Sequence, residues 1–269
     1  MFLLLACLNL HAADTPDYSA SILTQTVSAA DTKLAPSSVL DVTYIANEGF
    51  LIEAAGKKVL IDGLFENGFG IFAQPSAALQ EQMIQARFPF SKVDLILISH
   101  RHDDHFSAKL VTECLRNNSG CRLMADRQVV DLLRKTDGFS RIQNQVRELT
   151  LKPGKQEHLT VNSIDVTAIG LVHIPVYRDG RNLNEGLSNV GFLVDFGPAR
   201  FFHGGDASLG ENKTNLASIA FTEKPLDVLF VMGVLERPDQ FAEESGQFLK
   251  AYPGGVVFHE SLERRQFSR

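Results

Sequence analysis

The chain has 269 residues, which is enough for one large domain or two small ones. Hydrophobic residues make up 44% of it and charged residues 22%, the ordinary mix of a globular protein, so a wholly disordered, collagen-like or coiled-coil chain is excluded. The formal net charge is −6, from 26 Lys and Arg against 32 Asp and Glu, and no basic block is present that could follow a phosphate backbone. Nucleic acid is therefore not expected as a partner.

The first twelve residues predict a secretory signal peptide that is removed from the mature protein. Met1 to Leu10 is almost wholly apolar, and the small residue Ala12 precedes the expected cleavage point, although the usual positive start is missing. A lipoprotein with a lipidated Cys7 and an apolar N-terminus that is not a signal are the alternatives. We expect the mature protein to be periplasmic or secreted. No other stretch approaches the 18 apolar residues of a membrane helix, so no membrane-spanning segment is expected in the mature chain.

Residues 13–38 are predicted to be a leader or tether, because they are rich in Ala, Ser and Thr and show poor periodicity. Residues 39–269 are predicted to form one α/β domain. Three short β-rich runs separated by short turns predict an antiparallel meander, and a fourth, fully apolar run predicts a buried strand. These runs are residues 41–46, 49–54, 58–62 and 93–98.

Helical and strand patterns alternate in the rest of the chain. Helices are predicted at residues 106–115, 126–134, 211–220 and 240–251, and strands at residues 164–171, 190–196, 200–203, 227–232 and 256–258. Residues 136–153 show no clear pattern. Cys114 and Cys121 flank a predicted turn, and their spacing allows either a disulfide or two partly buried thiols.

Four residues that can bind a metal lie within six positions, directly after the predicted buried strand. They are His100, His102, Asp104 and His105. A tight loop can direct two imidazoles at one metal ion and the next two side chains at a neighbouring position. Such a full string is far more specific than an isolated pair of histidines. Arg101 and Asp103 alternate with these residues and are expected to point outward.

With this motif the sequence resembles the metallo-β-lactamase superfamily from Val39 to its end. In that family the remaining ligands follow later strands in the order His, Asp, His. Here His173, Asp206 and His259 each follow an apolar strand. The resemblance implies the α/β metallo-β-lactamase fold, a four-layer αββα sandwich. Asp62 resembles the buried Asp of the family and would accept an imidazole N–H, so that the other ring nitrogen faces the metal.

The resemblance also implies two metal ions per chain. His100, His102 and His173 would hold one, Asp104, His105 and His259 the second, and Asp206 would bridge them. This donor set suits Zn²⁺, with Mn²⁺ or Fe as possible occupants. The family chemistry is hydrolysis by a hydroxide shared between the metals, and Asp104 would orient that hydroxide and move its proton. His203, His158 and His11 lack such support and are left out of the metal set.

Departures from other branches narrow the expected function. Zinc β-lactamases with a Cys ligand carry that Cys where Asp206 stands, and flavodiiron oxygen reductases have Glu where His102 stands. The stretch from Arg200 to Asp206 is similar to the branch that holds L-ascorbate-6-phosphate lactonase and N-acyl-phosphatidylethanolamine phospholipase D. The expected function is metal-dependent hydrolysis of a small-molecule ester, lactone or phosphodiester. An acyl-homoserine-type lactonase and a non-catalytic metal-binding module are the alternatives.

The rim of the site decides the substrate, and two segments are candidates for it. Residues 63–72 follow Asp62 and carry three Phe, which could overhang the site as an apolar wall or pack against helices. Tyr177, Arg178 and Arg181 follow His173 and could bind an anionic group or lie in solvent as surface charges. The oligomeric state is left open by the sequence.

Overall fold

The computed structural model describes residues 23–28, 39–207, 211–216, 224, 226–231 and 256–259. Only the backbone is described for residues 23–28, 39, 231 and 256–259. The predicted signal peptide with Cys7 and His11, the rest of the predicted tether, and the predicted helix at residues 240–251 lie outside the described residues. Their predictions stay predictions.

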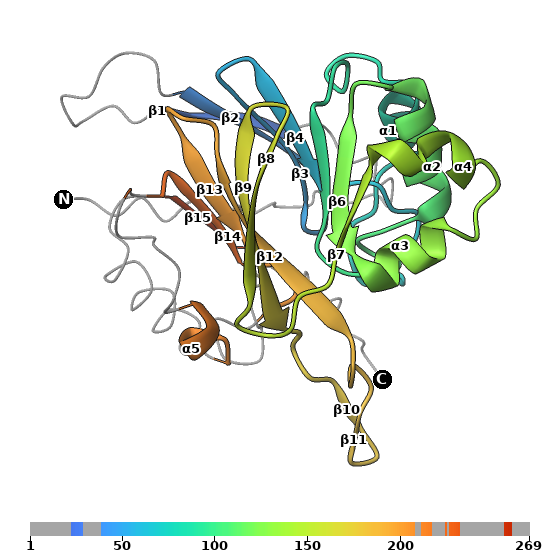
Figure 1. The fold of residues 1–269 in the computed structure, drawn as a ribbon, viewed down its shortest axis with the longest axis vertical. Coiled ribbons are helices and arrows are strands. Elements are labelled where there is room, and N and C mark those ends of the chain that lie inside the picture. Colours follow the sequence, from blue (N-terminus) through green and yellow to red (C-terminus); the bar gives the residue numbers. More distant parts are fainter. Residues whose placement is uncertain are drawn as a thin grey trace, which may run out of the picture.

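The first sheet has seven strands in the order β1 to β7, and it contains the predicted meander (Figure 1). Strands β1 to β4 pair antiparallel, which confirms the meander, and β4 to β7 pair parallel. Strand β1 lies inside the segment predicted as a tether, and β6 and β7 have no counterpart among the predicted strands. The strands are β1 (Leu23–Ser28), β2 (Val39–Ala46), β3 (Gly49–Ala54), β4 (Lys57–Ile61), β5 (Leu95–Ile98), β6 (Arg122–Asp126) and β7 (Val146–Leu149).

Helices cover the outer face of this sheet (Figure 1). They are α1 (Ala77–Ile84), α2 (Ala108–Asn117), α3 (Arg127–Leu133) and α4 (Phe139–Ile142), which continues into a 3-10 turn at Gln143–Gln145. Ser107 begins α2 as its N-cap, since its Oγ accepts a hydrogen bond from the Leu110 N–H. Helices α2 and α3 match the predicted helices within two residues, whereas α1 was not predicted.

The second sheet has six strands in the order β15, β14, β13, β12, β9 and β8. Its strands are β8 (Gln156–Val161), β9 (Ile164–Val172), β12 (Ser188–Asp195), β13 (Arg200–His203), β14 (Val228–Val231) and β15 (Val256–His259). The short strands β10 (Tyr177–Arg178) and β11 (Arg181–Asn182) form a hairpin that projects from the body between β9 and β12 (Figure 1). Of the helix predicted at 211–220, the described part contains α5 (Lys213–Leu216).

The two sheets face each other across an apolar core. Alternate residues of β12 and β13, among them Phe192 and Phe201, pack there against Phe50, Ile61 and other residues of the first sheet. A second core fills the space between the first sheet and its helices. Burying a side chain of this size contributes roughly 1.5–3 kcal/mol, so the cores hold the layers together. The described layers and the second sheet with α5 agree with the predicted αββα sandwich.

Cys114 and Cys121 lie in the helix-side core as free, buried thiols. Of the two alternatives left by the sequence, the structure has the thiols. Burial raises the pKa of Cys114 to about 12, so this thiol stays protonated and unreactive at neutral pH.

Because of the strand directions, one edge of the first sheet lies beside one edge of the second. Strands β9 and β13 both run antiparallel to β12, so their carboxyl ends lie at the same edge of the second sheet. The Val190 N–H at the start of β12 donates to the Ser99 carbonyl directly after β5, at 2.9 Å. The loops that follow β5, β9 and β13 therefore converge. Among the described residues no helix is long and apolar enough to cross a membrane.

Candidate metal centre

The loop after β5 is a tight turn in which some side chains are buried and others are exposed. The His105 and Phe106 N–H groups both donate to the His102 carbonyl, at 3.1 and 3.0 Å. His100, Asp104 and His105 are buried, whereas Arg101 and Asp103 are exposed, as the sequence predicted. The potential metal ligands therefore point into the protein, and the charged side chains of Arg101 and Asp103 point to solvent.

Two further loops bring His173 and Asp206 to the same place. The Ile174 N–H donates to the Asp206 carbonyl at 2.8 Å and ties the loop after β9 to the loop after β13. Gly205 has a φ of +54°, and a Cβ there would lie 2.6 Å from both Ser99 Cβ and Asn189 Oδ1. Glycine is therefore needed for the loop before Asp206 to approach the strand end that carries His100.

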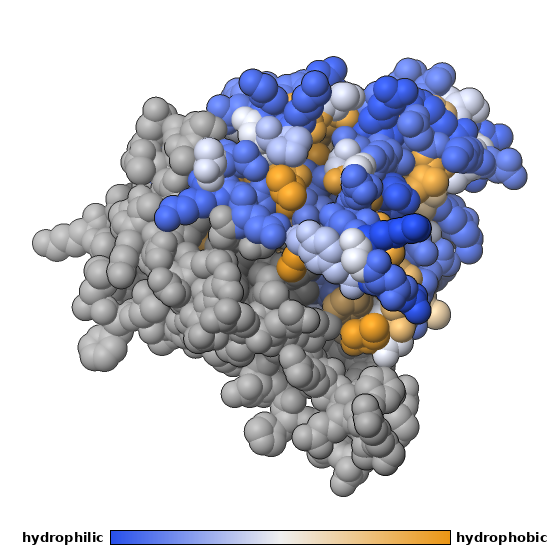
Figure 2. All heavy atoms as spheres, turned by 90° about the horizontal axis from the view of Figure 1, so that it is seen from below, coloured by the Kyte–Doolittle hydropathy of each residue, from blue (hydrophilic) through white to orange (hydrophobic). Residues whose placement is uncertain are grey.

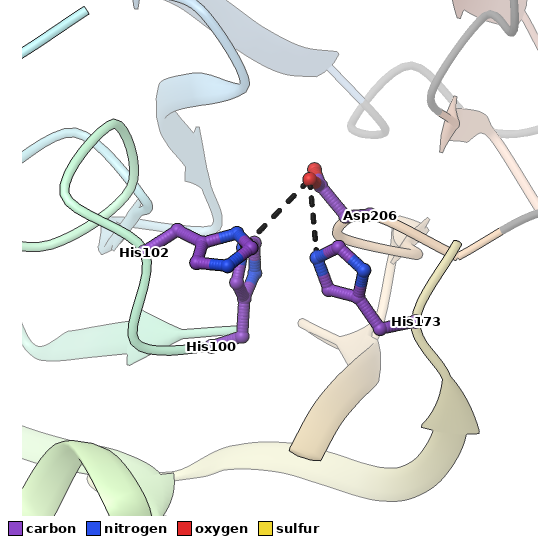
Figure 3. A group of neighbouring side chains, drawn as sticks. All are labelled: His100, His102, His173 and Asp206. Atoms are coloured by element: carbon purple, nitrogen blue, oxygen red, sulfur yellow. Dashed lines mark hydrogen bonds and ion pairs between the residues drawn. The ribbon is translucent and has the colours of Figure 1, made fainter. Parts of the chain in front are cut away.

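The carboxylate of Asp206 lies at the centre of the cluster and faces two sides. Its Oδ2 is 3.3 Å from His173 Nε2 and 3.7 Å from His100 Nε2 (Figure 3). Its Oδ1 is 3.1 Å from His105 Nε2. One oxygen is directed to each side, which is the arrangement that a bridging carboxylate needs. We call His100, His102 and His173 the imidazole half of the site, and Asp104 and His105 the carboxylate half.

In the imidazole half, ring nitrogens of separate histidines lie close to one another. His100 Nε2 lies 3.1 Å from His102 Nδ1, and these two residues, His173 and Asp206 each offer an atom within 4.8 Å of the others. His173 Nε2 is buried and makes no hydrogen bond, although it lies near Asp206. Burial and then the neighbouring imidazoles hold the pKa of His100 well below its usual range and lower that of His102 to about 4. Neutral rings with converging lone pairs suit a shared cation.

Hydrogen bonds on the far side of the His100 and His173 rings assign the tautomers that leave their Nε2 lone pairs free. Ser99 Oγ donates its proton to Asp62, so it accepts from His100 Nδ1 at 3.0 Å. His173 Nδ1 donates to the Ile174 carbonyl at 2.8 Å. In both rings Nε2 is then the nitrogen without a proton, as in metal-ligating histidines.

The carboxylate half has the opposite electrostatics. His105 Nδ1 donates to Asp62 Oδ2 at 3.1 Å, and its Nε2 faces Asp206 Oδ1 and, at 3.8 Å, Asp104 Oδ2. Burial alone would lower the pKa of His105, but the carboxylates of Asp206 and Asp62 outweigh it, so this pKa is raised well above its usual range. Burial alone would raise the pKa of Asp206, but His105 and His100 hold it well below its usual range. The carboxylates of this half therefore favour a positive charge beside them.

Asp62 orients histidines of both halves through hydrogen bonds. Asp62 directly follows β4 and has a φ of +46°. Its Oδ1 accepts a hydrogen bond from the Ser99 N–H at 2.8 Å. Its Oδ2 accepts from His105 directly and orients His100 through the Ser99 hydroxyl. The sequence placed Asp62 beside an imidazole but did not single out Ser99.

Three other side chains at the site were also not singled out. Asn47 Nδ2 donates to Asp104 Oδ2 at 3.3 Å and to the Asp104 carbonyl at 3.2 Å. Asn184 Nδ2 donates to the Ile174 carbonyl at 2.9 Å and links the β10–β11 hairpin to the loop of His173. Glu48 is buried and offers a carboxylate oxygen within 4.8 Å of ligand atoms of His105 and Asp206.

The other two histidines with described side chains, His203 and His158, are hydrogen-bonded to neighbouring residues. His203 accepts from the Gly205 N–H at Nδ1 and donates from Nε2 to the Glu48 carbonyl, so neither ring nitrogen is free for a metal. His158 is bonded to Thr167 on the surface of β8. The backbone of His259 ends β15 opposite Val231, and its side chain lies outside the described residues.

The donor set fits metal ions on these observations. Imidazole nitrogens and carboxylate oxygens converge from separate loops, and one buried imidazole nitrogen has no hydrogen bond. Ion pairs of Asp206 among the described residues are with imidazoles alone, so no Lys or Arg there takes the place of a cation.

Comparison with known proteins agrees with this geometry. The sequence profile of the family described as "Beta-lactamase superfamily domain" matches residues 57–263, more than half of the chain. The chain belongs to the metallo-β-lactamase superfamily. The UPF0173 metal-dependent hydrolase of Methanosphaera stadtmanae is 24% identical over 183 residues, 67% of this chain and 68% of that protein. The UPF0173 metal-dependent hydrolase of Aeropyrum pernix is 30% identical over 91 residues, and the match spans 34% of this chain and 31% of that protein.

Solved structures show the same fold. Igni18, a metallo hydrolase from Ignicoccus hospitalis, is 19% identical with a TM-score of 0.53, over 82% of this chain and 81% of that one. A protein from Parabacteroides distasonis is 16% identical with a TM-score of 0.53, over 90% of this chain and the whole of that one. These likenesses confirm the predicted metallo-β-lactamase fold.

Proposed function

We propose that this chain, a metal-dependent hydrolase of the metallo-β-lactamase superfamily, cleaves a small-molecule ester, lactone or phosphodiester with two divalent metal ions, Zn²⁺ first among them. The observation that carries the proposal is the Asp206 carboxylate, which directs Oδ2 to His100 and His173 and Oδ1 to His105. His100, His102 and His173 would hold one ion, and Asp104 and His105 the other, with His259 expected from the family pattern. When bound, the ions lower the pKa of water and polarise the substrate oxygen that becomes negative.

Asp104 is the residue that we expect to handle the proton. Its carboxylate is buried, and burial raises its pKa above the usual range. The Asn47 amide fixes Oδ2 of this carboxylate, so its orientation is set before substrate binds. From this position Asp104 can orient an attacking water, accept its proton and return the proton to the leaving group. His105 is held by Asp62 and stays in place through these steps.

The charges of the hairpin after His173 support the proposal that the substrate is anionic. Arg178 and Arg181 are opposite each other in the β10–β11 register, and both are exposed. Like charges directly opposite one another destabilise a strand pair, and a bound anion would remove that cost. Among the expected substrates this favours a phosphodiester or a lactone that carries an anionic group.

A second candidate, an acyl-homoserine-type lactonase, is supported by apolar residues after Asp62. Phe69 and Ile71 are exposed, whereas Phe65 is buried in the helix-side core. Seen from the hairpin end, the described surface is mostly hydrophilic with a few hydrophobic groups (Figure 2). Exposed apolar side chains of this kind can contact an acyl chain.

Elemental analysis and a chromogenic substrate panel test the proposal together. Protein expressed in metal-replete medium is expected to carry close to two equivalents of metal and to turn over at least one of a phosphodiester, a lactone and an ester. Turnover of lactones without phosphodiesters would select the second candidate. Less than half an equivalent of metal, or no turnover by fully loaded protein, would contradict the proposal.

A further inference from the structure

The turn between β2 and β3 reaches the metal centre from a part of the chain that contains none of the predicted ligands. Asn47 has a φ of +46°, and a Cβ on Gly49 would lie 2.8 Å from Gly63 Cα and 2.9 Å from the Asp62 carbonyl. The turn is therefore packed directly on the chain that follows Asp62, and only glycine allows this approach. Gly49 is thus required here by packing, and Asn47 takes up the left-handed conformation of the turn.

Glu48 is fixed in this turn by its own backbone. Its carbonyl accepts a hydrogen bond from His203 Nε2 at 3.0 Å, and His203 Nδ1 in turn accepts from the Gly205 N–H. The turn is therefore fastened to the loop that carries Asp206. Only about 5% of Glu48 is exposed, so its carboxylate is held inside the protein.

The carboxylate of Glu48 lies among the groups of the second metal position. It offers an oxygen within 4.8 Å of ligand atoms of His105 and Asp206. It also lies within 4.8 Å of Asp62, whose own oxygens are already taken by Ser99 and His105. His203, the third member of that second group, has both ring nitrogens bound. Of the two groups that include Glu48, only the one with His105 and Asp206 can receive a cation.

Charge compensation leads to the same assignment. Glu48, Asp62 and Asp104 are buried and Asp206 is nearly so, which places four carboxylates in one region. Among the described residues, the ion pairs of Asp62, Asp104 and Asp206 are with imidazoles. Buried carboxylates are costly unless positive charge lies beside them, and a divalent cation at this position would supply such charge.

We propose that Glu48 supplies a carboxylate to the second metal position, beside Asp104, His105 and Asp206, so that this position is richer in oxygen donors than the imidazole half. The inference rests on the proposed function, since it assumes that the site takes two metal ions. An oxygen-rich donor set accepts Mn²⁺ or Fe as well as Zn²⁺, whereas the imidazole half suits Zn²⁺.

Metal titration of the full chain tests the assignment. Chelator-treated wild type and Glu48→Gln are titrated with Zn²⁺ in a calorimeter. Wild type is expected to bind two equivalents. Glu48→Gln is expected to keep the first equivalent within about threefold and to weaken the second by at least about tenfold, since even residues behind the ligands change metal affinity by 10–100-fold. Glu53→Gln is the matched control, because Glu53 lies on the same hairpin and pairs with Lys58 away from the site.

Thermal unfolding separates a metal role from a structural one. In the metal-free state Glu48→Gln is expected to melt at the same temperature as wild type or higher, because it removes one of four neighbouring carboxylates. With metal it is expected to gain less stabilisation than wild type. If Glu48→Gln does not fold, Glu48→Asp, which keeps the charge, is expected to weaken the second equivalent alone.

Two results would overturn the assignment. One is a variant that binds both equivalents as wild type does. The other is a variant that loses both equally and melts lower without metal, as a structural residue would. These outcomes are distinct from a wild type that binds no metal, which would contradict the proposed function itself.

Discussion

The two halves of the candidate metal centre use the same residue type under opposite electrostatic conditions. In the imidazole half, burial and like neighbours lower the pKa values of His100 and His102. In the carboxylate half, Asp206 and Asp62 overcome the effect of burial and raise the pKa of His105. All three rings belong to one loop of six residues. The neighbours that each ring meets, and not the motif, therefore decide whether it is held neutral or draws a proton.

The largest expected effect comes from the carboxylate half. Asp104→Asn keeps the size of the side chain but makes it a weak, neutral ligand that cannot accept a proton. Turnover is expected to fall by about 10²–10⁴-fold, the usual contribution of general acid–base catalysis. At least one metal equivalent should remain, because the imidazole half is untouched. Kinetics with metal analysis measures both, and near-normal turnover would contradict the role of Asp104.

An intermediate effect is expected in the imidazole half. Ser99→Ala removes the hydroxyl between Asp62 and His100, so the His100 Nδ1–H loses its acceptor. Loss of such a partner typically weakens metal binding by 10–100-fold. Ser107→Ala is the control, since Ser107 caps α2 and should cost about 1 kcal/mol of stability without changing metal affinity. Equal metal affinity in Ser99→Ala and wild type would show that Asp62 does not act on this half.

The opposite pKa shifts predict a stability maximum for the metal-free protein. The pKa of His102 is about 4 against an ordinary 6.5, so the unfolded chain binds protons first as the pH falls below 6.5, and stability is lost there. The pKa of His105 is raised, so the folded protein keeps a proton that the unfolded chain releases, and stability is lost as the pH rises above 6.5. Melting temperatures in chelator are expected to peak near pH 6.5.

A matched variant assigns the acidic side of that profile. His102→Gln, which removes one titrating ring, is expected to lessen the fall below pH 6.5, to which His100 still contributes, and to leave the alkaline side unchanged. A wild-type profile that rises steadily from pH 4 to 9 would contradict the contrast between the two halves.

The smallest effect is expected from the loop residue that faces away. Arg101 is exposed, and its Nε donates to Gln128 Oε1 at 3.3 Å. Arg101→Ala should leave turnover within about threefold, which corresponds to roughly 0.7 kcal/mol. A collapse of activity, measured on the same substrate as for Asp104→Asn, would show that the loop faces the other way.

The fold could be predicted where the sequence pattern is local. The meander, the buried strand and helices α2 and α3 match their periodic runs. Strand β1 could not, because its pairing with β2 is a non-local contact and its own sequence is polar. Helix α1 was missed since only two of its residues, Leu79 and Met83, are buried and its pattern is weak.

The site shows the same division. His100, His102, Asp104 and His105 form a compact motif, and His173 and Asp206 follow apolar strands, so the chain order identifies them as candidates. The sequence indicates only a turn at Asn47 and Glu48, because their hydrogen bonds to Asp104 and His203 span 57 and 155 residues of the chain. Ser99 and Asn184 carry no pattern of their own. Residues that orient ligands are recognised through hydrogen bonds, which only the folded chain supplies.

Anomalous diffraction from crystals of the zinc-loaded protein tests the central claim most directly. The account predicts two peaks at the zinc edge, one on each side of the Asp206 carboxylate. The first should lie among His100, His102 and His173, and the second beside Asp104 and His105. A single peak confined to one half, or peaks remote from Asp206, would contradict it.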